Sequence, residues 1–201
     1  MNKAFEIIGE KFRTNIKRRI GNDNMPVLLR RGTRVELAQC FCDLGYTEGV
    51  EIGTQYGRFA KVLCESNPGL HLYCVDPWMA YQGYTIKQER QEKIYEKAMR
   101  TLKPLNVSVV KKASMDAVSD FPDASLDFVY IDGNHTFDYV MLDILFWQHK
   151  VKKGGVMALH DYRPGWWAGV VQAVDAYTHC HDIRPWFVTR EEEPTAFWVK
   201  K

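Results

Sequence analysis

The chain has 201 residues, of which 46% are hydrophobic, and this is enough for one ordinary globular domain without a second. It contains no apolar run of about 18 residues, and its polar N-terminus lacks the apolar centre of a signal peptide, so we expect neither a membrane span nor secretion. Five cysteines, an odd number, indicate free thiols in a reducing compartment, and we expect a cytoplasmic protein.

The formal net charge is +2, but residues 1–34 hold nine Lys or Arg against three Asp or Glu. A basic segment of this kind suits nucleic acid, an anionic substrate or a membrane surface. The favoured interpretation is simpler, because a charge run is commonly the solvated face of a helix.

The N-terminal part reads as helical. Phe5, Ile8, Phe12, Ile16 and Ile20 recur at near-helical spacing, which predicts an amphipathic helix over residues 3–20, and a second helix is predicted over 34–44. Beyond these, strands are predicted at 48–53, 70–76, 106–112, 126–132 and 154–161, and helices at 56–66, 86–102, 114–119, 136–149 and 167–179. Two strands, 183–189 and 195–200, close the chain.

This alternation predicts an α/β fold. Inner strands such as Phe128-Val-Tyr-Ile131 are continuous apolar runs, which is typical of a parallel sheet covered by helices on both faces. The last two strands are too close in sequence for a parallel crossover and should form an antiparallel hairpin. We therefore expect a doubly wound, Rossmann-like, seven-stranded sheet in a single domain, with a helical extension over 1–45 and the core over 46–201. The extension would cover the sheet edge or the pocket, or contact a second subunit in a homo-oligomer.

The segment from Glu51 to Gly57 is a glycine turn between a predicted strand and a predicted helix, which is typical of a nucleotide-binding α/β domain. A carboxylate at its entrance would repel the pyrophosphate of a dinucleotide, so Glu51 argues against NAD. It suits a ligand that joins adenosine to an amino acid and a sulfonium. S-adenosylmethionine is such a ligand.

Polar residues end the other predicted strands, where open α/β sheets bind their ligands. These residues are Asp76, Ser114, Asp132, His160 and Asp161. Asp76 lies where such folds place an acid that accepts the ribose hydroxyls, although an acid that caps the turn before Pro77 would look the same. The aromatic segment from Pro77 to Tyr84 is either a lid over the site or a packed connector.

Four motifs, Glu51-x-Gly-x-x-x-Gly57, Val75-Asp-Pro-Trp78, Tyr130-Ile-Asp-Gly-Asn-His135 and Leu159-His-Asp-Tyr162, together resemble class I S-adenosylmethionine-dependent methyltransferases. The sequence is most similar to the macrocin-type sugar O-methyltransferases and more distantly to catechol and caffeoyl-coenzyme A O-methyltransferases. The resemblance implies that Glu51, Gly53, Thr54, Gln55 and Gly57 hold the methionine portion of the cofactor, Asp76 its ribose, and Trp78, Ser114 and Met115 its adenine. Pro77 and Asp132 complete the implied cofactor site.

The acceptor hydroxyl needs activation by a general base, a metal, or both. In the resembling enzymes, magnesium is bound by acids that map onto Asp132 and the His160-Asp161 pair, so these three are candidate ligands of Mg²⁺ or another divalent metal. The alternative is that the acids only orient the substrate. His135 is similar to the base position of part of the family, and His135 and Asp161 are the predicted catalytic residues. The alternative for His135 is a histidine that caps or packs a helix.

Together these features predict O-methylation of a small hydroxylated molecule such as a sugar or a phenol. The loop Tyr162-Arg-Pro-Gly-Trp-Trp167 would wall the acceptor pocket with aromatic rings, or else pack against the sheet. RNA methylation, with the basic N-terminal segment as a binding arm, is a less favoured alternative. A non-catalytic module that only binds S-adenosylmethionine is the second.

Overall fold

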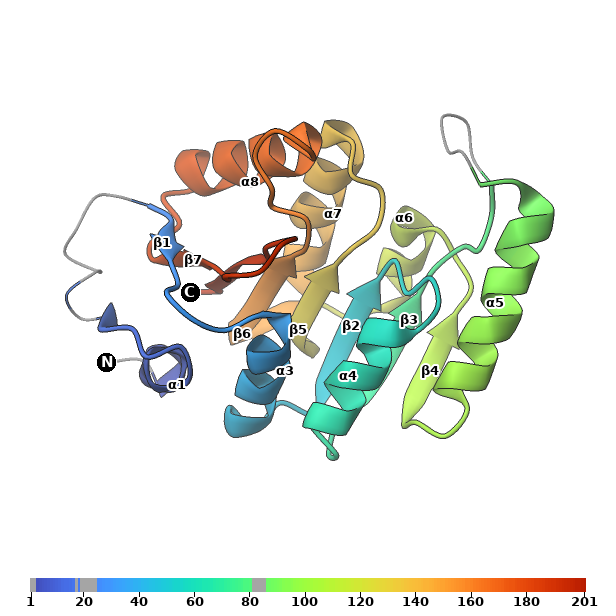
Figure 1. Cartoon of the computed structure of the whole chain (residues 1–201), viewed down its shortest axis with the longest axis horizontal. Coiled ribbons are helices and arrows are strands. Elements are labelled where there is room, and N and C mark those ends of the chain that lie inside the picture. Colours follow the sequence, from blue (N-terminus) through green and yellow to red (C-terminus); the bar gives the residue numbers. More distant parts are fainter. Residues whose placement is uncertain (1–2, 17, 19–24, 81–85) are drawn as a thin grey trace.

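The computed structural model describes residues 3–16, 18, 25–80 and 86–201. Its centre is an eight-stranded sheet in the order β1-β7-β8-β6-β5-β2-β3-β4 (Figure 1). The strands are β1 Val27–Leu28, β2 Glu48–Ile52, β3 His71–Val75, β4 Val107–Val110, β5 Leu126–Ile131, β6 Val151–Leu159, β7 Trp186–Val188 and β8 Ala196–Val199. Only β8 runs antiparallel to its neighbours, β6 and β7, so the predicted closing hairpin is confirmed.

Helices cover both faces of the sheet, as predicted (Figure 1). On one face lie α1 Lys3–Lys11, α3 Arg34–Asp43, α4 Arg58–Ser66 and α5 Gln88–Leu102. On the other lie α6 Ser114–Ala117, a 3-10 turn Val118–Asp120, α7 Phe137–Lys150 and α8 Ala168–Cys180. Strand β5 serves both layers, because Phe128 and Tyr130 face the first and Val129 and Ile131 the second.

Two predictions need correction. The sheet has an eighth strand, since β1 adds two residues in parallel to β7 at the edge. The first helix ends at Lys11 instead of residue 20, because Arg13 has a left-handed φ of 48° and the N–H of Thr14 bonds back to the carbonyl of Gly9. Phe12 and Ile16 are still buried. The apolar spacing therefore predicted correctly which side chains are buried, but it did not predict where the helix ends. Residues 17, 19–24 and 81–85, which include part of the predicted helix and lid, lie outside the described residues.

The order of the strands determines where a ligand can bind. Connections run to opposite sides of the sheet on either side of the β2–β5 pair, and such a switch point opens a crevice at the carboxyl ends of the two strands. Gly53 follows β2 and Asp132 follows β5, so both lie at this crevice. Within the described residues, no helix combines the length and apolar composition that crossing a bilayer requires.

Candidate active site

Glu51 lies near the end of β2 with only 2% of its surface exposed. Its Oε2 atom and the hydroxyl of Thr54 are buried without a hydrogen-bond partner of standard geometry among the described residues. Burial, reinforced by the carboxylates of Asp132 and Asp76, raises the pKa of Glu51 to about 8. A cationic group brought by a ligand would satisfy this carboxylate, so the residue fits the ammonium of S-adenosylmethionine.

The turn after β2 needs glycine at two positions. Gly53 has φ +89°, and a Cβ there would lie 2.0 Å from the carbonyl oxygen of Asp132. Gly57 has φ +73°, and a Cβ there would lie 2.9 Å from Leu102. We expected these glycines to admit a ligand, but the close approach at both is made by the protein itself. Their contact with a cofactor stays a prediction, while the Gly53 contact joins the turn directly to Asp132.

Asp76 follows β3 and ties two loops together. Its Oδ2 accepts the backbone N–H of Gln55 at 2.8 Å, and its Oδ1 accepts that of Trp78 at 2.7 Å. Asp76 therefore does cap the turn that contains Pro77. It also fixes the segment from Glu51 to Gly57, here called the cofactor turn. Because each carboxylate oxygen has two lone pairs, capacity for the ribose hydroxyls is left, and that role stays a prediction.

Trp78 differs from its expected role. The side chain is 1% exposed, its ring lies 5.0 Å from that of Tyr95, and its indole N–H donates to the carbonyl of Gln55 at 2.8 Å. A ring buried in this way presents no face to an adenine. Trp78 instead stabilises the cofactor turn through its bond to Gln55, and its ring packs in the core against Tyr95.

Ser114 also has a structural task. Its hydroxyl donates to the carboxylate of Asp143 and accepts the indole N–H of Trp147 at 2.7 Å. Asp143 is buried, and burial raises its pKa to about 7. Little hydrogen-bonding capacity is left on the Ser114 hydroxyl for adenine. Met115 is half-buried against the same apolar layer, and its place beside the cofactor stays a prediction.

Asp132, His135, His160 and Asp161 form one compact group beyond β5 and β6, here called the His–Asp cluster. Nε2 of His135 lies 2.9 Å from Oδ2 of Asp161 and 3.7 Å from Oδ1 of Asp132. Nδ1 of His160 lies 3.2 Å from Oδ1 of Asp161 and 3.5 Å from Oδ1 of Asp132. All the residues predicted for the base and the metal are thus brought together.

The cluster is electrostatically paired. Burial works against a charged imidazole, but the carboxylates of Asp132 and Asp161 outweigh it and raise the pKa of both His135 and His160 to about 9. The two histidines hold the pKa of Asp132 and of Asp161 below the ordinary value despite burial. The carboxylates therefore favour the protonated form of both imidazoles, and the imidazoles favour the ionised form of both carboxylates.

The same side chains fit a divalent metal. Ligand atoms of Asp132, His135 and Asp161 lie within 4.8 Å of one another. Nε2 of His135 and Nδ1 of His160 are buried, and neither makes a hydrogen bond of standard geometry. Two imidazole nitrogens beside carboxylates suit manganese, iron or zinc better than magnesium, which prefers oxygen ligands.

Arg34 is a site residue that the sequence reasoning missed. It is the first residue of α3, and its Nη1 lies 3.8 Å from Oδ2 of Asp132. The guanidinium carbon lies 4.9 Å from the ring centre of Phe59 on α4. The one available signal was the basic bias of residues 1–34, which singles out no individual arginine.

The loop after Asp161 divides into two parts. The ring of Trp167 lies 4.5 Å from that of His135, and Trp166 is 69% exposed beneath the guanidinium of Arg163. Tyr162 points elsewhere, since its hydroxyl donates to Asp175 on α8 at 2.8 Å. An aromatic wall for an acceptor would therefore consist of the tryptophans and not of Tyr162.

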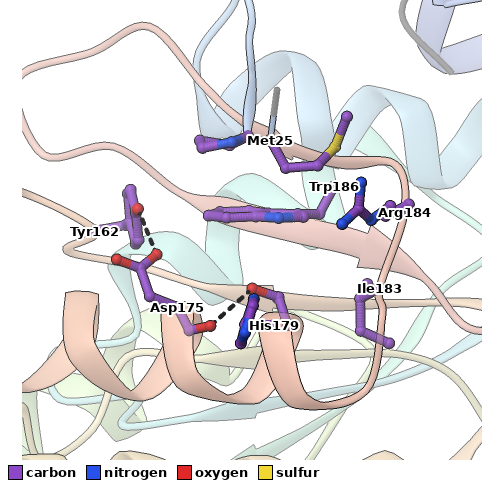
Figure 2. Close-up of a pocket in the computed structure, with 9 residues that line it drawn as sticks. Met25, Tyr162, Asp175, His179, Ile183, Arg184 and Trp186 are labelled. Atoms are coloured by element: carbon purple, nitrogen blue, oxygen red, sulfur yellow. Dashed lines mark hydrogen bonds between the residues drawn. The ribbon is translucent and has the colours of Figure 1, made fainter. Parts of the chain in front are cut away.

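Tyr162 lines a separate cavity of about 300 Å³ beside α8 (Figure 2). Figure 2 shows Trp186 between Met25 on one side and Asp175 and His179 on the other. None of the residues predicted for the cofactor, the metal or catalysis lines this cavity. Cavity size alone thus does not locate the chemistry of this fold.

A family model described as a methyltransferase domain matches residues 50–162, more than half of the chain. The chain belongs to this methyltransferase family. The matched region contains the cofactor turn and the entire His–Asp cluster, and it confirms the class I S-adenosylmethionine-dependent methyltransferase indicated by the sequence motifs. Arg34 lies outside the matched region of the methyltransferase.

Solved structures share the fold of the methyltransferase. It is similar to the O-methyltransferase NovP at 16% identity, with a TM-score of 0.62 over 84% of this chain and 79% of that one. It is similar to an O-methyltransferase from Bacillus cereus in complex with SAH at 15% identity, with a TM-score of 0.62 over 97% of this chain and 91% of that one. It is also similar to the TomG O-methyltransferase from Streptomyces achromogenes in complex with SAM, at 14% identity. The TM-score is 0.60, and the match covers 100% of this chain and 91% of that one.

A relative by sequence is the uncharacterized protein y4gI of Sinorhizobium fredii, which is 28% identical over 118 residues. The alignment covers 56% of the methyltransferase but only 13% of that relative. The chain therefore matches only a small part of that much longer relative, and similarity to the relative assigns no activity to this chain.

Proposed function

We propose that the methyltransferase transfers a methyl group from S-adenosylmethionine to a hydroxyl of a small ring-bearing molecule, such as a sugar or a phenol. The observation that carries the proposal is the contact between the cofactor turn and the His–Asp cluster, where a Cβ on Gly53 would lie 2.0 Å from the carbonyl oxygen of Asp132. A donor held by the turn and an acceptor held by the cluster would meet at this point. Alignment of the two supplies most of the catalysis in a direct displacement.

On the donor side, S-adenosylmethionine when bound supplies an electrophilic methyl group on a sulfonium. Glu51 pairs with its ammonium, and Asp76 accepts from its ribose hydroxyls while it still holds the N–H of Gln55. Gly53, Thr54, Gln55 and Gly57 shape the turn, and Pro77 and Met115 border the remaining surface. These assignments draw support from the unpartnered, buried carboxylate oxygen of Glu51.

On the acceptor side, His135 is the proposed general base. A base must be neutral to accept a proton, whereas the pKa of about 9 keeps His135 protonated in the ligand-free protein. Only the neutral fraction of His135 can accept the proton, so turnover should rise with pH towards the pKa of about 9. Asp161, 2.9 Å away, orients the imidazole and stabilises the imidazolium that forms.

A divalent metal is the alternative route to an activated hydroxyl. Asp132, His135, His160 and Asp161 would hold it, and a bound metal lowers the pKa of a coordinated hydroxyl. The two routes exclude each other only at a single nitrogen of His135, because a nitrogen that ligates a metal cannot also accept a proton.

The proposed acceptor class rests on the rings next to the base. Trp167 lies 4.5 Å from His135, and Trp166 and Phe137 are exposed close by in the sequence at 69% and 39%. Aromatic faces pack well against sugar and phenol rings. Arg163 is paired with Glu193 at 2.7 Å, so it brings little free positive charge for a polyanion.

Calorimetry with S-adenosylmethionine, followed by measurement of S-adenosylhomocysteine formed with panels of phenols and sugars, tests the proposal. We expect cofactor binding, and product with at least one ring-bearing alcohol. Absence of binding at millimolar cofactor would contradict both the donor and the activity. Turnover with an RNA panel alone, lost steeply as salt rises, would replace the small acceptor with nucleic acid.

A further inference from the structure

We infer that Arg34 binds the α-carboxylate of S-adenosylmethionine, so that Arg34 and Glu51 together clamp the amino-acid end of the cofactor. The inference rests on the proposed function and adds a cofactor residue that lies outside the matched family region. It also gives the N-terminal helical extension a task in the site.

The chemistry of the site calls for a cation. The amino-acid end of the cofactor carries an ammonium and a carboxylate, and Glu51 can pair only with the ammonium. The carboxylate would then face the negative charges of Asp132 and Asp76, both of which act on Glu51. Like charges repel strongly in a partly dry site, so a positive partner is needed. Arg34 is near enough that its charge opposes the rise in the pKa of Glu51.

Arg34 has donors to offer. Its nearest carboxylate contact, Nη1 to Asp132, is 3.8 Å, which is an ion pair but too long for a hydrogen bond. The guanidinium also interacts with the hydroxyl of Tyr130. The side chain is 35% exposed, so further N–H groups remain accessible. A guanidinium has five N–H donors in a planar fork that matches a carboxylate.

The guanidinium is also held in place. Its carbon lies 4.9 Å from the ring centre of Phe59, on the helix that the cofactor turn opens. The N–H of Arg34 donates to Oε1 of Glu191 at 2.7 Å, and Thr33 caps α3 in a capping box with Glu36. The start of α3 is thus fixed to the closing hairpin, and Arg34 is pre-oriented towards the site.

A competing role is that Arg34 only neutralises Asp132. The two roles differ in what they do to a cofactor analogue that lacks the carboxylate. Decarboxylated S-adenosylmethionine keeps the sulfonium and the ammonium, so it needs Glu51 but not an Arg34 clamp.

The experiment measures the Kd of S-adenosylmethionine and of its decarboxylated analogue by calorimetry. It uses wild type, Arg34→Gln, Arg34→Lys and, as a control, Arg31→Gln, since Arg31 is an exposed arginine of the same segment. We expect Arg34→Gln to weaken S-adenosylmethionine about ten- to a hundredfold and the analogue less than about twofold. Arg34→Lys should fall in between, and Arg31→Gln should match wild type.

An equal loss for both ligands, or none for either, in Arg34→Gln would overturn the inference while leaving the proposed function intact. Failure of wild type to bind either ligand would overturn the proposed function and the inference with it. Because the two constants are compared on the same folded variant, a lower Tm affects both alike. If Arg34→Gln does not fold, the ratio in Arg34→Lys decides, since a lysine ammonium lacks the bidentate fork.

Discussion

Nε2 of His135 lies 2.9 Å from Oδ2 of Asp161, and this pair joins the segment after β5 to the loop after β6. We predict that His135→Ala lowers turnover at saturating substrate by about 100-fold or more, because it removes the base. Binding of S-adenosylmethionine should change little, as His135 lies on the acceptor side. Steady-state kinetics and calorimetry on the same preparation check both. Unchanged turnover would remove His135 from the mechanism.

The raised pKa of Glu51 predicts that the protein releases a proton when the cofactor binds. Its pKa of about 8 in the ligand-free protein means that the carboxyl is mostly protonated at pH 7, and pairing with an ammonium should ionise it. Binding of S-adenosylmethionine at pH 7 should therefore release about one proton more in wild type than in Glu51→Gln. Calorimetry in two buffers of different ionisation enthalpy measures the difference. Equal proton release by the two proteins would contradict the pairing.

Asp143 makes stability depend on pH. Its pKa is about 7 in the folded protein against an ordinary 3.8, so the folded state holds the proton more tightly. The stability that this gives is complete below about pH 4 and is lost as pH rises through 7. We expect the Tm of wild type to fall relative to Asp143→Asn between pH 4 and 8. A constant difference across that range would show that Asp143 is ionised in the folded protein.

Gly53→Ala should be strongly destabilising, by about 3 kcal/mol or more, because a Cβ would lie 2.0 Å from backbone of Asp132 and φ is +89°. Gly154→Ala is a matched control, since Gly154 has φ +85° but nothing within 4 Å of the added Cβ. The control should cost about 1–2 kcal/mol through φ alone. Denaturant unfolding measures both. Equal losses would mean that the contact with Asp132 relaxes freely.

The mixed donors of the His–Asp cluster predict metal preference. If the cluster binds a metal, manganese or zinc should bind more tightly than magnesium, and His160→Asp should shift the preference towards magnesium. Calorimetry and tryptophan emission report binding without turnover, because Trp167 lies 4.5 Å from His135. Full activity after exhaustive chelation, with no binding of any of the three ions, would leave the base as the means of activation.

The sequence predicted the type and order of the main elements. Continuous apolar runs indicate buried strands, and the short spacing between the last two strands indicates an antiparallel hairpin. It also placed Glu51, Asp132 and Asp161 at the crevice, since strand order in such sheets leaves few choices. Side-chain direction was harder. Trp78 turned into the core, and Tyr162 turned to Asp175, because tertiary packing and not the local sequence decides where a ring points.

Arg34 was missed for a related reason. It lies 17 positions before Glu51 in the sequence, and no local motif marks it. Its position depends on a contact with Glu191, a partner 157 residues away. Contacts of such separation leave no periodic trace in the sequence.

That contact has a consequence for the order in which the molecule is completed during synthesis. The strands from β2 to β6 and the glycine turn are made before Glu191 leaves the ribosome, whereas the amide of Arg34 receives its partner only afterwards. A nascent chain can therefore hold five of the eight strands, β2 to β6, while the amide of Arg34 still lacks its bond to Glu191. Arg34 is therefore made 157 residues before the partner of its amide.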